Sequence, residues 1–234
     1  MAINSTLIAQ HLSEVQQRIK AAAAQAQRVP PTLMAVSKTR SMEEILALHD
    51  LGVRSFGESY VQEAIVKLDD IQATRPDHHI EWHFIGPIQS NKSRIIAERF
   101  DWVHSVDRLK LAQRLSAQRP PTRPPLQVCI QVNIDNEASK SGFKVEELSE
   151  VIPKLLILPQ IQLRGFMCIP RKRDHLEQQR EPFRALAELH NHWATTIGEH
   201  WDTLSMGMSD DIEAAILEGA SIVRVGTALF GPRD

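Results

Sequence analysis

The sequence contains very little cysteine, and this shortage excludes two kinds of stabilised fold. Only two of the 234 residues are cysteines, Cys129 and Cys168, which is too few for a disulfide framework or a thiolate zinc site. Each cysteine lies inside an apolar run. We therefore expect both to be buried thiols of a reduced, cytoplasmic protein.

An excess of charge of one sign and long apolar runs are also absent. The formal net charge is -2, so the chain lacks the excess of basic residues that is typical of proteins that bind nucleic acid or an anionic membrane. No apolar stretch approaches the roughly 20 residues of a membrane-spanning helix. Residues 1–6 lack the basic start and apolar run of a signal peptide. The remaining composition, 42% hydrophobic and 24% charged, is that of an ordinary globular protein.

Short apolar runs of strand length alternate with helical patterns along the chain. The predicted strands are Leu33–Ser37, Val53–Phe56, Trp82–Ile85, Trp102–Val106, Leu126–Ile134, Leu163–Ile169, Thr203–Met206 and Ile222–Val225. A first helix is predicted after Ser5, and later helices are predicted from Ser41 and over 60–68, 93–100, 108–118, 145–156, 181–192 and 210–218.

This alternation predicts an α/β fold with a parallel sheet and right-handed crossovers. Eight strands in a chain of this length favour a single (β/α)8 TIM barrel, formed by one domain over residues 1–234. The first helix is then an addition at the N-terminus. The alternative is a doubly wound open sheet.

Lys38 follows directly after the first predicted strand. A lysine at the C-terminal end of an apolar strand faces a partly desolvated pocket. Desolvation favours the neutral form of an amine, which is a nucleophile toward carbonyl groups. Lys38 is therefore a candidate Schiff-base lysine. The alternative is a strand-end lysine whose ammonium group extends into water.

Glycine and hydroxyl residues follow the seventh and eighth predicted strands, where barrels often bind phosphate. Gly207 would let the backbone approach a ligand, and Ser209 offers a hydroxyl before the helix over 210–218. Gly226 and Thr227 supply a bare backbone and a second hydroxyl. Together these residues predict a phosphate site. The alternative is that Ser209 only caps its helix and Gly226 only eases a turn.

Two acidic residues, Asp210 and Asp211, lie close to this predicted phosphate site and would repel the anion. We expect both in the first turn of the following helix, where the helix dipole favours acids. Their side chains should then turn away from the ligand, and Gly219 should end the helix.

Arg224 interrupts the eighth strand, which is otherwise apolar. Strand alternation places Arg224 on the same face as Gly226, so it should lie beneath any ligand that Gly226 contacts. A buried guanidinium needs a partner, and an acid on a neighbouring strand is the alternative to a ligand. An amine, a phosphate site and a buried cation together match pyridoxal 5'-phosphate, which needs a Schiff-base lysine, phosphate contacts and a partner for its ring nitrogen.

The chain resembles the pyridoxal phosphate homeostasis proteins, which are single-domain relatives of the N-terminal barrel of alanine racemase. The matching stretches span almost the whole chain: residues 35–39, 56–63, 82–87, 89–92, 139–142, 204–211 and 224–231. The resemblance implies that Lys38 forms the Schiff base, that Ser209, Gly226 and Thr227 contact the phosphate, and that Arg224 faces the pyridine nitrogen. Ser59 replaces the family's usual asparagine, so we assign no contact to its loop.

The resemblance implies a binding protein that stores, buffers or delivers pyridoxal 5'-phosphate, rather than an enzyme. We expect a monomer whose partners are the cofactor and the enzymes that receive it. Related racemases use a second base, a tyrosine from a second domain, whereas this chain ends at Asp234 and has one tyrosine, Tyr60. Arg224 would also oppose protonation of the ring nitrogen. The alternatives are an amino-acid racemase of low activity and a Schiff-base aldolase acting on a phosphorylated sugar.

Two further residues, His83 and Lys140, are candidates for acid–base or amine chemistry. We expect His83 to be a buried, hydrogen-bonded structural histidine, the alternative being an acid or base. We expect Lys140 to be a solvated loop lysine at the functional end of the barrel, the alternative being a second amine for the aldehyde.

Overall fold

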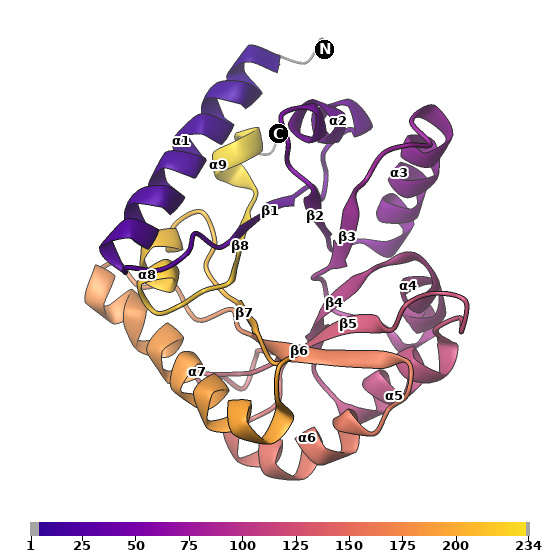
Figure 1. Ribbon diagram of the computed structural model, residues 1–234, viewed down its shortest axis with the longest axis vertical. Helices are drawn as coiled ribbons and strands as arrows, with labels where there is room; N and C mark the ends of the chain where they lie inside the picture. Colours follow the sequence, from indigo (N-terminus) through magenta and orange to yellow (C-terminus); the bar gives the residue numbers. More distant parts are fainter. Residues whose placement is uncertain (1–4, 233–234) are drawn as a thin grey trace.

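The structure is a computed structural model that describes residues 5–232, and its parallel strands form a closed barrel (Figure 1). Each strand pairs with the next in sequence, and β1 also pairs with β8, which closes the sheet. The strands are β1 (Thr32–Val36), β2 (Ser55–Glu58), β3 (Glu81–Phe84), β4 (Trp102–Val106), β5 (Leu126–Gln131), β6 (Ile161–Met167), β7 (Thr203–Ser205) and β8 (Ile222–Val225). The predicted barrel is therefore confirmed, and the open sheet is wrong.

Helices cover the outside of this barrel (Figure 1). They are α1 (Ser5–Gln25), α2 (Met42–Asp50), α3 (Val61–Thr74), α4 (Ser93–Arg99), α5 (Leu109–Gln118), α6 (Leu148–Leu156), α7 (Leu176–Ile197), α8 (Ile212–Leu217) and α9 (Thr227–Phe230). Ser41 caps α2, the helix predicted from this residue, with a full capping box. None of the described helices is long and apolar enough to cross a lipid bilayer.

The added helix α1 packs against α8 and α9, beside the seam where the chain's first and last strands meet (Figure 1). One of its faces buries Ile8, Leu12, Val15 and Ile19 at helical spacing. Each fully buried side chain of this size contributes about 1.5–3 kcal/mol. Helix α1 therefore stabilises α8 and α9, the helices that follow β7 and β8.

The inner face of the barrel is polar over part of its length. The strand register pairs Met34 with Arg224 and His83 with Trp102, and alternation carries His104 onto the same face as Trp102. Barrel interiors are usually filled by branched aliphatic side chains. In this protein the large aliphatic core lies between the strands and the helices instead, and the interior contains hydrogen-bonded side chains.

Several predicted boundaries were wrong by a few residues. Val53 belongs to the α2–β2 connection, where its N–H donates to the carbonyl of Leu48, and β2 runs from Ser55 to Glu58 instead. The helix predicted over 181–192 begins earlier and ends later, as α7. The interpretation of residues 1–6 as lacking a leader rests largely on residues 1–4, which lie outside the described residues.

Candidate functional site

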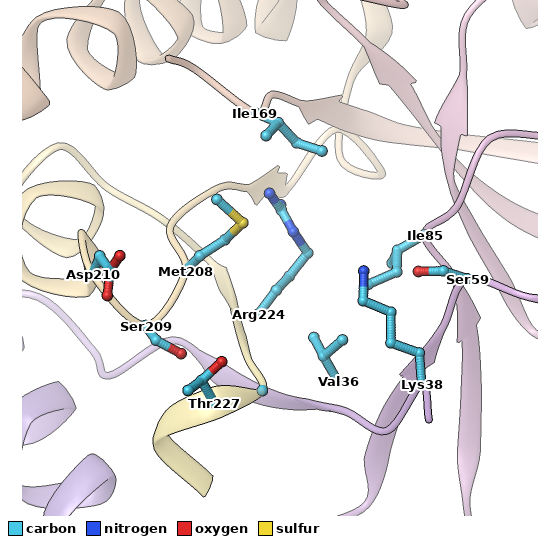
Figure 2. Close-up of a pocket in the computed structure, with 11 residues that line it drawn as sticks. Val36, Lys38, Ser59, Ile85, Ile169, Met208, Ser209, Asp210, Arg224 and Thr227 are labelled. Atoms are coloured by element: carbon cyan, nitrogen blue, oxygen red, sulfur yellow. The ribbon is translucent and has the colours of Figure 1, made fainter. Parts of the chain in front are cut away.

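A cavity of about 280 Å³ opens where the strands end at their carboxyl termini (Figure 2). This is the end of a (β/α)8 barrel at which active sites are built. Its volume is close to the lower end of the range for small-ligand pockets, about 300–1,000 Å³. Its lining consists of Val36, Lys38, Ser59, Ile85, Ile169, Met208, Ser209, Asp210, Arg224, Gly226 and Thr227. The five residues predicted to bind the cofactor, Lys38, Ser209, Arg224, Gly226 and Thr227, are all among them.

Lys38 projects into this cavity from just beyond the end of β1. Its side chain is half-buried, and Figure 2 shows the amine beside Ser59 and Ile85 rather than directed away from the site. Ser59 was not assigned a contact from the sequence, and the structure places it on the lining next to Lys38.

A partly buried cluster of Glu58, Glu63 and Lys67 fixes the backbone on both sides of Lys38. The Lys67 ammonium donates to the Ser37 carbonyl (2.8 Å), to Glu58 Oε1 (2.9 Å) and to Glu63 Oε1 (2.5 Å). The Ser37 hydroxyl donates to Glu58 Oε1 at 2.7 Å. Glu58 is fully buried and Lys67 is 7% exposed. Sequence reasoning missed this cluster because its members lie on β2 and α3 and meet Ser37 only in the folded chain.

The residue after the lysine has an unusual backbone conformation. Thr39 has φ 64°, which is rare for a β-branched residue, and its N–H donates to Glu63 Oε1 at 2.5 Å. Such a conformation persists only where the surroundings fix it. The Glu58–Glu63–Lys67 cluster supplies those surroundings, so the position of Lys38 is determined by side chains outside the cavity.

Burial also perturbs the Glu58 carboxyl within this cluster. Its pKa is raised by burial, which outweighs the opposing effect of the Lys67 ammonium. Its Oε2 atom has no hydrogen-bond partner among the described residues. Within residues 5–232 the cluster therefore leaves one oxygen of a fully buried carboxyl group without a hydrogen bond.

Ser209 and Thr227 face each other on the side of the cavity across from Lys38 (Figure 2). The Ser209 hydroxyl accepts the N–H of Ala228 at 3.4 Å, which links the β7 loop to the start of α9. The prediction that Ser209 caps the following helix is wrong. That helix, α8, begins only at Ile212, and its cap residue is Asp211.

The two acidic residues also differ from their predicted placement, because both precede α8. Asp210 is one of the lining residues and its side chain is largely exposed, so the expectation that this side chain turns away from the ligand stays a prediction. Its carboxylate lies 3.6 Å from the ammonium of Lys172 on the exposed rim. Asp211 accepts the N–H of Met208 at 2.6 Å and is not part of the lining.

Gly207 has a packing role rather than the predicted approach to a ligand. Its φ is 89°, and a Cβ added there would lie 2.5 Å from the Ala215 Cβ on α8. Gly207 is not among the residues that line the cavity. Gly226 does line it, and it presents a bare backbone beside Val36.

Arg224 rises from β8 into the base of the cavity (Figure 2). The residue is 4% exposed, and burial lowers the pKa of its guanidinium. Nη1 donates to the Ser205 carbonyl (2.5 Å) and hydroxyl (2.8 Å), and Nη2 donates to the Cys168 carbonyl (2.9 Å). No acid within residues 5–232 forms a salt bridge with it, so the predicted alternative of an internal ion pair is wrong.

His83 is a buried structural histidine, as expected. It is 1% exposed and hydrogen-bonds to His104 and Glu81. Lys140 is less solvated than predicted, because its ammonium donates to the Ile169 carbonyl (3.1 Å) and pairs with Glu137 (2.8 Å). It lines a second cavity that shares Ile85 and Ile169 with the first.

Both cysteines are free, buried thiols, as predicted. Burial raises the pKa of both thiols, that of Cys168 to about 12. Among the described residues, no group of three or more histidine, cysteine, aspartate or glutamate side chains is arranged to hold a metal ion.

Comparison with known proteins gives consistent matches over nearly the whole chain. The family model for the alanine racemase N-terminal domain matches residues 10–234. The pyridoxal phosphate homeostasis protein of Pseudomonas aeruginosa is 52% identical over 229 residues, which cover 97% of this chain and 96% of that protein. The protein of the same name from Escherichia coli K12 is 48% identical over 229 residues and covers 97% of each chain.

A solved structure gives the same result in three dimensions. PipY of Synechococcus elongatus, solved with PLP bound, aligns with a TM-score of 0.81 and 32% identity, covering 96% of this chain and 100% of PipY. PipY without PLP aligns with a TM-score of 0.84 and 34% identity.

Proposed function

This chain belongs to the family of the pyridoxal phosphate homeostasis proteins, and we propose that it binds pyridoxal 5'-phosphate to store, buffer or deliver it inside the cell. The observation that carries the proposal is the meeting of Lys38, Arg224, Ser209 and Thr227 in one cavity. The names of the relatives and the PLP-bound PipY structure support the same ligand.

The aldehyde of the cofactor fits beside Lys38. Lys38 would hold the cofactor as a Schiff base, whose formation from the amine and the aldehyde would release one water molecule. Val36, Ile85 and Ile169 make the lining of the cavity partly apolar. Lys38 then holds the cofactor covalently but reversibly, as storage and delivery require.

The phosphate would lie on the side of the cavity opposite Lys38. The hydroxyls of Ser209 and Thr227 are its proposed donors, and Gly226 leaves the backbone accessible there. Asp210 lies at the rim beside Lys172, which partly offsets its repulsion of the anion.

Arg224 would face the ring nitrogen from the base of the cavity. The cofactor supplies an electron sink when its ring nitrogen is protonated. A guanidinium beside that nitrogen opposes protonation, because two positive charges would be adjacent. The residues around the cavity therefore favour holding the cofactor over using it in catalysis.

Two alternative functions give different results in one pair of measurements. A Schiff-base aldolase on a phosphorylated sugar would purify without cofactor colour, whereas the proposed binding protein purifies yellow. A racemase would exchange the α-hydrogen of an amino acid with deuterated water. We expect no exchange at an enzymatic rate with the common amino acids, and turnover of about 1–1,000 per second would overturn the proposal.

The proposal extends to the organisation and surroundings of the protein. We propose that residues 1–234 form one cofactor-binding barrel that acts as a monomer. Its partners would be enzymes that take up pyridoxal 5'-phosphate, and the buried free thiols support a reducing, cytoplasmic location. Gel filtration of the protein with and without cofactor tests the monomer directly.

A further inference from the structure

A column of polar side chains runs through the barrel interior from the candidate site to the opposite end. It begins at Arg224, whose Nη1 donates to Ser205 Oγ at 2.8 Å. Ser205 Oγ lies 2.7 Å from His104 Nδ1, and His104 Nε2 lies 2.9 Å from His83 Nδ1. His83 Nε2 lies 2.9 Å from Glu81 Oε2.

The two ends of this column lie in different environments. Arg224, Ser205, His104 and His83 are each at most 4% exposed. The Glu81 side chain is 47% exposed and lies at the N-terminal end of β3. A buried polar column in place of aliphatic packing is costly unless every member is hydrogen-bonded, and here every member is.

With both histidine rings neutral, the carboxylate at one end fixes the direction of every hydrogen bond between Glu81 and Ser205. A guanidinium can only donate, and an ionised carboxylate can only accept. The pKa of Glu81 is lowered, chiefly by its hydrogen bond with His83, so it is ionised at neutral pH. His83 Nε2 must therefore carry a proton that it donates to Glu81.

The same reasoning orients the remaining links. A neutral histidine that is protonated at Nε2 has only a lone pair at Nδ1. His83 Nδ1 must then accept a proton from His104 Nε2, and His104 Nδ1 must accept the hydroxyl proton of Ser205. Burial lowers the pKa of His104 well below its usual value, which keeps that ring neutral.

We infer that Glu81, His83, His104 and Ser205 form a directed hydrogen-bond relay that positions Arg224 beneath the ligand. The hydroxyl proton of Ser205 is committed to His104, so Ser205 Oγ offers only lone pairs to Arg224. The guanidinium is then held by neutral acceptors alone, namely Ser205 and the Cys168 carbonyl. It keeps its charge at the base of the cavity.

These four are positioning residues, since they act through Arg224. The part of the inference that concerns the ligand rests on the proposed function. The direction of the relay does not, because it is a property of the protein without cofactor.

The first test determines the tautomers of His83 and His104 in the cofactor-free full-length protein. Long-range ¹H–¹⁵N correlation spectra at neutral pH should show both rings protonated at Nε2. A ring protonated at Nδ1, at either position, would overturn the relay. If the tautomers are correct but the protein binds no pyridoxal 5'-phosphate, only the proposed function fails.

The second test removes the acceptor at the far end of the relay with Glu81→Met. The variant should show mixed tautomers at His104, two links away, and should bind pyridoxal 5'-phosphate about fivefold more weakly, the effect of one net hydrogen bond. The absorption band of the bound cofactor should also shift, which a loss of stability alone would not produce.

Trp102→Phe is the matched control for this variant. Trp102 Nε1 donates to the other oxygen of the same carboxylate, Oε1, at 3.0 Å, and the Trp102 ring stacks on His83. Phenylalanine keeps an aromatic ring there, so the change removes a Glu81 contact and none of the relay's hydrogen bonds. We expect wild-type tautomers and affinity. If Trp102→Phe changes the His104 tautomer as much as Glu81→Met does, packing around Glu81 accounts for the effect and the relay is refuted.

Discussion

Lys38 owes its position to residues that do not touch the cavity. Its backbone neighbours Ser37 and Thr39 are both held by the Glu58–Glu63–Lys67 cluster. A reactive group must be held to within a fraction of an ångström to function, and supporting contacts provide this precision. The cluster is therefore as much a part of the site as the residues that line it.

We predict that Lys67→Met impairs the reaction of Lys38 with pyridoxal 5'-phosphate. The change leaves the carboxylates of Glu58, which is fully buried, and Glu63 without their ammonium partner. It also removes the donor to the Ser37 carbonyl. Breaking a buried ion pair costs about 3–5 kcal/mol. The rate of cofactor binding, followed by absorbance, should fall in Lys67→Met and recover in part in Lys67→Arg.

A control variant separates positioning from general loss of stability. Glu218→Gln weakens another partly buried ion pair, with Arg180 and Arg184, far along the chain on the helical layer. It should lower the melting temperature without changing the binding rate. Equal binding rates in Lys67→Met and wild type would contradict the positioning role.

A second prediction at the residue scale concerns the two hydroxyls. Each charge-assisted hydrogen bond to a phosphate contributes about 1.5–3 kcal/mol. Ser209→Ala combined with Thr227→Val should therefore bind pyridoxal 5'-phosphate barely more tightly than pyridoxal. Thr74→Val, which removes a hydroxyl on α3 that bonds only to the Asp70 carbonyl, is the control and should keep the preference. An unchanged preference in the double variant would refute the phosphate site.

The lining residues could be predicted from the sequence only where a local pattern marked them. Lys38, Arg224, Gly226 and Thr227 adjoin apolar strands, and all line the cavity. The contacts beneath them were not predictable, because no local pattern joins Lys67 to Ser37 or His104 to Ser205. Such pairs form only when the barrel brings distant strands and helices together.

At the scale of the elements, strand β6 depends on close contact with β7. A Cβ added at Gly165 would lie 1.7 Å from the carbonyl oxygen of Thr203, and the register between β5 and β6 shifts just before this glycine. Backbone cannot yield as a flexible side chain can. The glycine therefore permits the pairing of β6 with β7, the strand on which Ser205 contacts Arg224.

We predict that Gly165→Ala destabilises the fold by at least about 1–3 kcal/mol, the cost that is typical of overpacking. Gly57→Ala is the matched control, since its Cβ would meet the flexible Met34 side chain, at 2.7 Å from its sulfur. Urea denaturation should show a markedly larger loss for Gly165→Ala. Similar losses in both variants would contradict this account of the β6–β7 contact.

Element boundaries were predicted less well than element types. β2 ends at Glu58, a buried acid, and acidic residues are not typical of strands. The predicted strand, Val53–Phe56, therefore lay two residues early. The start of α8 was misplaced because Ser209 fits a cap pattern, whereas Asp211 occupies the cap position. In each case a tertiary contact decided the local structure.

For the whole molecule, the buried neutral histidine His104 makes stability depend on pH. Its pKa is lowered well below 6.5 in the folded state, whereas the unfolded chain has the ordinary value. Below pH 6.5 the unfolded chain therefore binds a proton that the folded protein does not. The free energy of unfolding should fall with decreasing pH by up to about 1.4 kcal/mol per pH unit from this group.

Urea denaturation at pH 7.5 and 5.5 checks this expectation. His104→Gln should show a smaller difference between the two pH values than wild type. The comparison isolates His104 from Glu58, whose raised pKa acts in the opposite direction and is present in both proteins. An identical pH dependence in the two proteins would show that His104 does not stay neutral.

The architecture as a whole was predictable because it depends on many weak signals that agree. Alternating strands and helices recur along the chain, and the closed barrel follows from their number and order. The polar barrel interior was not predictable, because His83 and His104 are far apart in the sequence. Only the register between β3 and β4 brings them into contact.

The most direct test of the central claim is to trap the cofactor on the protein. Reduction of the purified, cofactor-loaded protein with borohydride converts a Schiff base to a stable amine, and mass spectrometry of the digest locates it. We predict one adduct, on the peptide that contains Lys38, and its loss in Lys38→Ala. An adduct on Lys140 or Lys92 in the wild-type protein, with none on Lys38, would contradict the account.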